Sequence, residues 1–219
     1  SKYQYLEKAD RSFLRRVAEG TTERLISIDY VLDSVSRTKV ARMKPYIRTV
    51  LRMSAYQILY LDRVPDSAAC NEAVKLVKKR GFAGLAGFVN GVLRTVSRKK
   101  GCIAYPDTAT ACSMPAWLAE RLEGWYQKET AEAMMRAFLE DRPLTVRFKE
   151  SGESEAEILA SLQAQGVSAR RIFEGINAWE LTGVDYPEAF AAFQKGQIQF
   201  QDASSILCGE AVPLKEGDL

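Results

Sequence analysis

Apolar residues recur every three to four positions through residues 1–100, and no alternating pattern interrupts them. A spacing near 3.6 residues places such side chains on one face of an α-helix. The pattern predicts four helices, over about 10–35, 45–59, 66–80 and 84–98. We therefore expect this half of the chain to fold as an all-helical bundle.

Proline, glycine and capping residues predict where these helices begin, bend and end. Pro45 suits the first turn of a helix, where its missing N–H would have no helical partner. Asp66 or Ser67 is expected to cap the third helix, and Gly81 to end it in a left-handed conformation. Gly20 interrupts the first stripe and is expected to bend that helix.

Four glycines fall close together within residues 81–91, but they do not form a phosphate-binding loop. Their spacing matches neither the dinucleotide nor the Walker pattern, and a helix rather than a strand precedes them. We instead expect Gly87 and Gly91 to let a neighbouring helix approach closely.

Residues 101–219 mix helical and strand patterns, after a stretch over 101–112 that we interpret as a linker. Ser113 is expected to cap a helix with Pro115 in its first turn. Ser154 and Glu157 form a capping box that opens another helix. The order strand–helix–strand–strand–helix–strand predicts a small α+β domain of the ferredoxin or RNA-recognition type. The expected elements are a helix over 127–140, strands over 144–149, 167–173, 178–182 and 198–200, and helices over 154–166, 187–193 and 204–211.

Charge divides the chain at the same place. Apolar residues make up 47% and charged residues 27%, as in folded globular proteins. Residues 1–100 hold 21 lysines and arginines against 9 acidic residues, a net charge of +12, whereas residues 101–219 hold 10 against 19, a net charge of −9. The switch predicts two domains, over 1–100 and 113–219, and the basic one favours a polyanionic partner.

Basic residues repeat at helical spacing beside the apolar stripes. Three pairs are four residues apart and are followed by Lys99 and Lys100: Arg48 with Arg52, Lys75 with Lys79, and Arg94 with Arg98. A solvated helix face explains any one of these pairs. Three pairs together predict that the bundle binds RNA or DNA phosphates.

Several classes of chemistry are excluded. The chain contains no histidine, which removes histidine-dependent catalysis and histidine metal ligands. No stretch of 18 apolar residues exists, and the N-terminus lacks a signal-peptide pattern. We expect no metal site and no membrane partner.

The four cysteines, Cys70, Cys102, Cys112 and Cys208, have neither metal-binding spacing nor the density of a disulfide scaffold. We interpret them as buried or idle thiols of a cytoplasmic protein. Cys208 lies in an apolar stripe with Ile206 and Leu207 and is expected in the core.

Seven short motifs carry a resemblance to a known family: Ile47–Tyr60, Val64–Ser67, Asn71–Val74, Gly87–Arg94, Ser113–Leu118, Arg142–Arg147 and Phe200–Ser205. They resemble one enzyme family, the bacterial ribosomal RNA small subunit methyltransferases B. Residues 42–98 resemble its NusB-like domain, and the second half is similar to the region that precedes its catalytic domain. Free NusB, a transcription antitermination factor, shares only the bundle.

The resemblance implies that the parent enzyme methylates the 5-position carbon of a cytosine in 16S ribosomal RNA, with S-adenosylmethionine as methyl donor. A cysteine thiolate that adds to the neighbouring ring carbon makes this carbon nucleophilic. The family's cofactor loop and attacking cysteine would follow Leu219, and its first bundle helix would precede Ser1. We therefore expect residues 1–219 to be a piece of a longer enzyme, without cofactor-binding or catalytic residues and inactive alone.

The same resemblance implies that this segment captures and positions RNA beside the missing methyltransferase domain. Arg147 is the strongest candidate for substrate contact, because its planar guanidinium suits phosphates and base edges. A structural ion pair with an acidic neighbour is the alternative for Arg147. The family usually has asparagine where this chain has Lys149, which leaves the role of that position open. Gln201, Asp202 and Ser205 are expected to order the junction with the catalytic domain.

A second function stays open for the segment as a whole. A NusB-like bundle could instead dock another protein in transcription antitermination or ribosome assembly. This alternative predicts a patch of exposed apolar residues on the bundle.

Overall fold

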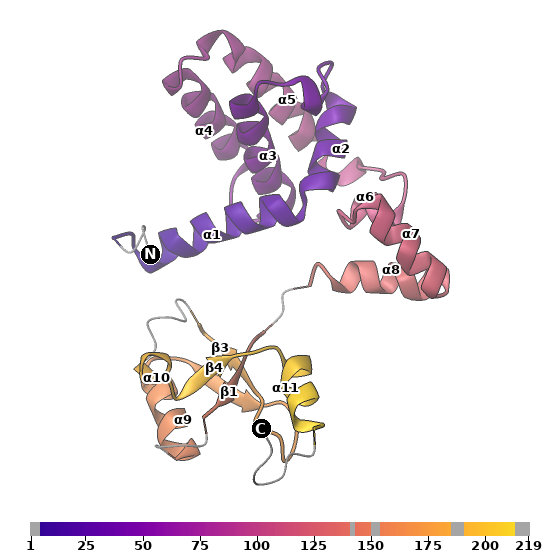
Figure 1. Cartoon of the computed structure of the whole chain (residues 1–219). Helices are drawn as coiled ribbons and strands as arrows, with labels where there is room; N and C mark the ends of the chain where they lie inside the picture. Colours follow the sequence, from indigo (N-terminus) through magenta and orange to yellow (C-terminus); the bar gives the residue numbers. More distant parts are fainter. Residues whose placement is uncertain (1–4, 141–142, 150–153, 185–190, 213–219) are drawn as a thin grey trace. The chain divides into compact units, whose positions relative to one another are not determined.

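The computed structural model describes residues 5–140, 143–149, 154–184 and 191–212 (Figure 1). The chain divides into two compact units, with the boundary after Glu140. The first unit is helical, and the second contains a four-stranded sheet. This confirms the predicted fold class, a helical bundle followed by a small α+β domain.

Five helices build the bundle: α1 (Lys8–Glu23), α2 (Leu25–Val35), α3 (Pro45–Tyr60), α4 (Asp66–Lys79) and α5 (Ala86–Lys99). Short 3-10 turns lie at Val40–Arg42, Ala83–Leu85 and Lys100–Cys102. The predicted stripe of α3 is buried, and Leu51 and Ile58 are inaccessible to solvent. They pack with Ile28, Leu32 and Leu93 of the neighbouring helices in one continuous core.

The first predicted helix is two helices. The chain breaks at Arg24, whose φ of −96° and ψ of 19° leave the helical range, and not at Gly20. Gly20 has a different role, because a Cβ at this position would overlap the ring and hydroxyl of Tyr56 in α3. The missing side chain therefore lets α1 pack directly on α3. The close approach predicted for Gly87 and Gly91 is wrong, since a Cβ at either position meets nothing within 4 Å.

The ends of α4 are partly as predicted. Gly81 follows the helix with a φ of +84°, which confirms the left-handed C-terminal turn. At the other end Pro65 is the N-cap, without a side-chain cap. The Asp66 carboxylate instead accepts a hydrogen bond of 2.6 Å from the Ser97 hydroxyl in α5. It therefore joins two helices rather than capping one.

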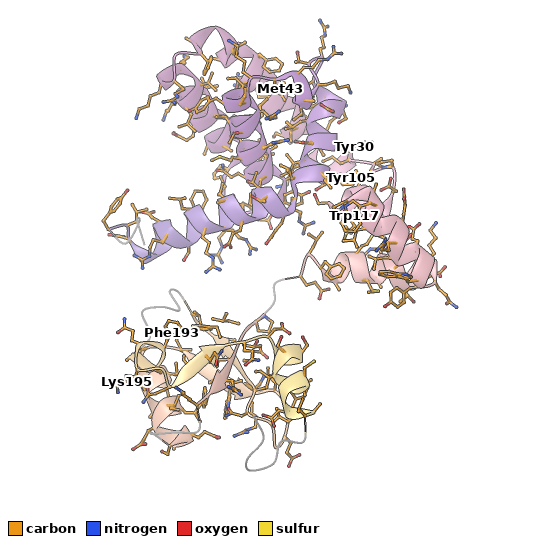
Figure 2. All side chains as sticks on the ribbon, viewed as in Figure 1. Tyr30, Met43, Tyr105, Trp117, Phe193 and Lys195 are labelled. Carbon is orange, nitrogen blue, oxygen red and sulfur yellow. The ribbon has the colours of Figure 1, made fainter. Side chains whose placement is uncertain are left out.

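Three further helices belong to the same unit as the bundle: α6 (Thr108–Ala111), α7 (Ala116–Trp125) and α8 (Lys128–Ala137). The structure differs here from the predicted division, since α6 lies inside the expected linker 101–112 and the unit continues to Glu140. Contacts between Tyr30 of α2 and the segment around Tyr105 attach these three helices to the bundle (Figure 2). Their ring centroids are 5.6 Å apart, and the Tyr30 hydroxyl donates a 3.0 Å hydrogen bond to the Ala104 carbonyl.

Ser113 caps a helix, but not the predicted one. Its Oγ accepts hydrogen bonds from the backbone N–H groups of Ile26, at 2.8 Å, and Ser27, at 3.1 Å. These groups lie in the first turn of α2, where the N-cap residue Arg24 offers no side-chain acceptor. Ser113 reaches them from a φ of +58°, and α7 starts after Pro115 instead. Residues distant in sequence are thereby joined at one helix end.

The second unit has the predicted element order: β1 (Leu144–Phe148), α9 (Glu155–Ala164), β2 (Ser168–Arg171), β3 (Trp179–Thr182), α10 (Ala191–Gln194), β4 (Ile198–Phe200) and α11 (Ala203–Glu210). The sheet order is β2-β3-β1-β4, and all pairs are antiparallel. The Ser154–Glu157 capping box of α9 is confirmed. The helix start expected at Pro187 lies outside the described residues.

Side chains alternate between the two faces of this sheet. Val146, Phe148 and Trp179 point to the face where α9 and α10 pack. The rings of Phe148 and Trp179 stack with centroids 4.7 Å apart, and the Arg171 guanidinium lies 4.4 Å from the Trp179 centroid. Figure 1 shows α11 on the other side of the sheet. The core of the unit therefore lies between one sheet face and α9 with α10.

We predict that Ser113→Ala lowers the free energy of unfolding of the chain by about 1 kcal/mol, because the first turn of α2 loses its acceptor. Urea denaturation followed by circular dichroism measures this. The matched control is Ser67→Ala, an exposed serine in the first turn of α4, where we expect a change below about 0.5 kcal/mol. Equal effects of the two substitutions would contradict the capping role of Ser113.

Candidate nucleic-acid interface

The predicted basic pairs of α4 and α5 lie at opposite ends of an antiparallel helix pair. The hydrogen bond between Asp66 and Ser97 places the start of α4 beside the end of α5. Lys79 is the last residue of α4, and Arg98 is near the last residue of α5. A helix of this length spans roughly 20 Å, so the two pairs are separated by about that distance. The structure therefore does not gather the predicted residues at one site.

One end of the bundle combines cations with two aromatic rings, and we call it the Tyr46 end. It consists of Lys44, Tyr46, Arg48, Lys75, Lys78, Lys79, Arg80 and Phe82. The Tyr46 hydroxyl donates a 3.2 Å hydrogen bond to the Leu76 carbonyl, which ties the start of α3 to the last turns of α4. The rings of Tyr46 and Phe82 stack with centroids 5.8 Å apart.

Cations flank both rings of the Tyr46 end. Lys44 Nζ lies 5.2 Å from the Phe82 centroid, and the Arg80 guanidinium lies 5.9 Å from the Tyr46 centroid. Both cations are exposed, as are Lys78 and Lys79. These ring contacts hold positive charge near the start of α3, where the helix dipole is also positive. The Tyr46 end is therefore suited to bind anions.

Two of the predicted residues at the Tyr46 end have different environments. Arg48 follows Lys44 by one helical turn, and its Nε is buried without a hydrogen-bond partner. Lys75 is exposed and forms a 2.6 Å ion pair with Glu72. An exposed pair of this kind contributes little to stability, so Lys75 is free to exchange partners.

Arg94 and Arg98 are exposed at the opposite end, which we call the Arg98 end. The Arg98 guanidinium donates a 3.1 Å hydrogen bond to the Thr95 hydroxyl, and Lys99 beside it is exposed. Lys100 lies 3.9 Å from the carboxylate of Asp62. The Arg98 end is therefore a second basic surface, and two acids, Asp62 and Asp66, lie near it.

Arg52 has a structural partner. Its Nε and Nη2 donate to the two carboxylate oxygens of Asp29, at 2.7 and 2.5 Å. The pair joins α3 to α2, and the side chains are only 21% and 29% exposed. Because both carboxylate oxygens are engaged by the guanidinium, this arginine is held away from an RNA phosphate.

Arg147 lies on the outer face of the sheet. It is exposed at the fourth position of β1, between the inward-pointing Val146 and Phe148. The structural ion pair considered as its alternative role is absent among the described residues. Its guanidinium therefore faces solvent.

The cysteines form two classes. Cys70 and Cys112 are buried, and burial raises the pKa of each thiol. Cys102 and Cys208 are exposed. The expectation that Cys208 lies in the core is wrong, because α11 buries Ile206 and leaves the next two residues outside. Within the described ranges, three or more metal-ligating side chains do not come together, and no helix is long and apolar enough to cross a membrane.

The aromatic part of the Tyr46 end was not predicted from the sequence. Tyr46 and Phe82 are 36 positions apart, and only the packing of α3 against α4 brings their rings together. Each follows a basic residue by two positions, Lys44 and Arg80, and this repeated spacing was the available signal.

Two family models match the chain, one to each half. Residues 1–98 match the NusB family, and residues 114–182 match the RsmF/B-like methyltransferase ferredoxin-like domain. A solved structure described as the crystal structure of PH0851 has the same fold, with a TM-score of 0.70 and 17% identity over 93% of this chain and 47% of the other.

Curated relatives fall into two groups. A probable ribosomal RNA small subunit methyltransferase B of Bacillus subtilis (strain 168) is 34% identical over 97% of this chain and 48% of its own length. A protein of the same description from Synechocystis is 28% identical over 91% of this chain and 46% of its own length. The transcription antitermination protein NusB of Symbiobacterium thermophilum is 36% identical over 48% of this chain and 70% of its own length. The chain thus spans about half the length of the methyltransferases that it matches.

We predict that Arg52→Gln lowers the free energy of unfolding by about 1–3 kcal/mol, because it leaves the partly buried Asp29 without its bidentate partner. Arg15→Gln is the control. It breaks the Arg15–Glu19 pair of α1, whose side chains are more than half exposed, and should cost less than about 0.5 kcal/mol. Urea denaturation of both variants tests the difference, and equal losses would show that the Asp29 pair is not structural.

Thiol reactivity should separate the cysteines by burial. At pH 8 a disulfide reagent such as dithionitrobenzoate should modify Cys102 and Cys208 at least about tenfold faster than Cys70 and Cys112, whose raised pKa values and burial keep them protonated and shielded. All four should react quickly in urea. Fast labelling of Cys70 or Cys112 in the folded chain, located by peptide mass spectrometry, would contradict this assignment.

Proposed function

Because the chain belongs to the NusB family over residues 1–98 and carries the ferredoxin-like domain of RsmF/B-type methyltransferases, we propose that it captures ribosomal RNA and positions it for methylation. The Tyr46 end carries this proposal. Four exposed cations lie there, Lys44, Lys78, Lys79 and Arg80, and none forms an ion pair with a described residue. Clustered lysines and arginines of this kind bind phosphates and release counterions.

The proposed binding surface extends beyond the Tyr46 end. Arg94 and Arg98 at the opposite end of the helix pair would contact phosphates about 20 Å away, roughly the length of one α-helix of 14 residues. Arg147 in the second unit would contact the substrate near the reacting base. Arg52 is not retained in this set, since Asp29 occupies its guanidinium.

The proposed reaction of the whole enzyme is methylation of carbon 5 of a cytosine in 16S ribosomal RNA. The names of the relatives support a methyltransferase that acts on RNA of the small ribosomal subunit. S-adenosylmethionine would donate the methyl group. The cytoplasm, where ribosomal RNA of bacteria is made, is the proposed location.

The described residues do not fit the methyl donor. The closely spaced glycines within residues 81–91 follow a helix and lie in the turn that ends α4, in a 3-10 turn and in α5, so they do not form a nucleotide-binding loop after a strand. The buried thiols of Cys70 and Cys112 also disfavour the thiolate that would attack cytosine. We therefore assign no methyl-transfer step to these residues, and we expect the 219-residue chain to bind RNA without methylating it.

A protein-docking role is the second candidate function, and two tryptophans favour it. Trp117 and Trp125 are 65% and 66% exposed, two helical turns apart on α7. Arg121 lies between them, with its guanidinium 5.5 Å from the Trp125 centroid. Tryptophan and arginine dominate the energetic centres of protein interfaces.

We predict that the 219-residue chain binds a single-stranded ribosomal RNA fragment with strong salt dependence. If the chain makes about five phosphate contacts, raising the salt concentration from about 50 to 200 mM should weaken binding roughly a hundredfold. Lys75→Glu with Lys79→Glu should weaken binding at least about tenfold at 50 mM, because two attractive charges become repulsive. Fluorescence anisotropy measures both effects.

Lys128→Glu is the matched charge control, since Lys128 is exposed on α8, away from the Tyr46 end. It should change affinity by less than about threefold. Salt-independent binding, or equal losses in the control and the double variant, would exclude the bundle as the RNA-binding surface. Loss of binding to a partner protein in Trp117→Ala, with RNA binding intact, would support the docking role instead.

A further inference from the structure

The outer face of the sheet carries two planar polar side chains side by side. Arg147 in β1 is directly opposite Gln199 in β4, and both are exposed. Directly opposed residues in antiparallel strands have Cβ atoms about 5 Å apart. Lys149, two residues after Arg147, is also exposed, and the two-residue period of a strand places it on the same side.

This part of the outer face is open and positively charged. Glu180, the nearest acid of β3 on the same face, is bound by the guanidinium of Arg170 in β2. The start of α11 lies at the other end of β1, where the Thr145 hydroxyl donates a 2.6 Å hydrogen bond to the Gln201 carbonyl. The positions of Arg147 and Gln199 are therefore neither neutralised nor covered by described residues.

The described strands present no aromatic side chain on this face. Phe148 and Trp179 point to the opposite face and are buried there. The polar groups of Arg147 and Gln199 therefore favour recognition by hydrogen bonds. A guanidinium donates in a fixed plane, and a glutamine amide both donates and accepts, which together match the edge of a nucleobase. A base presents such an edge only when it is unpaired, as in the loops and ends of RNA.

We propose that Arg147 and Gln199 read the edge of one unpaired RNA nucleotide, while Lys149 contacts a neighbouring phosphate. The proposal rests on the RNA-binding function proposed above and adds a second, base-selective contact to the phosphate contacts of the bundle. It assigns a role to Gln199 and Lys149, and it explains how an α+β unit whose described strands carry no outward aromatic residue contacts RNA.

Affinity for single-stranded and double-stranded RNA of equal length tests the proposal with the full 219-residue chain. At 50 mM salt, Arg147→Ala and Gln199→Ala should each weaken binding of a mixed-sequence single strand about five- to tenfold and leave duplex binding within about twofold. Gln199→Glu should weaken it further, because the new carboxylate would occupy the Arg147 guanidinium. Lys149→Ala should weaken binding to both RNAs alike.

Thr182→Ala is the matched control, because Thr182 is an exposed polar residue on the same face, in β3, and its truncation changes no charge. This control should change the affinity for neither the single-stranded nor the double-stranded RNA. Circular dichroism verifies that all variants are folded. Equal losses on single strand and duplex in Arg147→Ala would overturn base reading. Unchanged binding in both the Arg147 and Gln199 variants, with a loss in Lys75→Glu plus Lys79→Glu, would overturn the sheet-face contact, indicate a protein-facing surface and leave the bundle function intact. Absence of RNA binding by the unaltered chain would overturn both proposals.

Discussion

The surface chemistry of the bundle depends on where its few carboxylates are used. Residues 1–100 contain 9 acidic residues for 21 basic ones, and several of the acids act inside the fold. Asp29 binds Arg52, Asp66 binds the Ser97 hydroxyl, and Asp33 accepts a 2.7 Å hydrogen bond from the Val40 N–H. Each of these bonds joins separate segments. The acids thus stabilise tertiary contacts, and Lys44, Lys78, Lys79 and Arg80 at the Tyr46 end form no ion pair with a described residue.

This division of charge explains why the basic surface is at helix ends. The sides of α3, α4 and α5 face one another and bury Leu51, Val77 and Leu93. At the Tyr46 end the stacked rings of Tyr46 and Phe82 give two cations a place to pack outside this core. A cation–π contact positions a positive charge but does not neutralise it, whereas a carboxylate would neutralise it. The same contacts therefore organise the surface and keep it attractive to phosphate.

The second unit reaches a similar result through strand alternation. Apolar residues alternate inward along β1 and β3, and polar residues alternate outward, so one face supplies the core and the other remains polar. Arg170 and Glu180 neutralise each other on the outer face. Arg147 and Gln199, which lie opposite each other on this face, stay exposed to solvent. The two units thus offer RNA different chemistry, namely phosphate attraction on the bundle and directional hydrogen bonds on the sheet.

The periodicity of apolar residues determined most of the elements, because each helix or strand buries one face of its own sequence. The stripe of α3, the left-handed turn at Gly81 and the capping box of α9 were local patterns and could be predicted. The break at Arg24, the cap that Ser113 provides to α2 and the contact of Gly20 with Tyr56 depend on segments distant in sequence. For the same reason, only part of the candidate site could be predicted from the sequence. Sequence alone identified a basic half and named Arg147 as a candidate for RNA contact. Tertiary packing paired Arg52 with Asp29, separated Lys79 from Arg98 and placed Gln199 beside an exposed Arg147. Only the fold could decide this, since a charge can bind RNA only where folding leaves it unpaired.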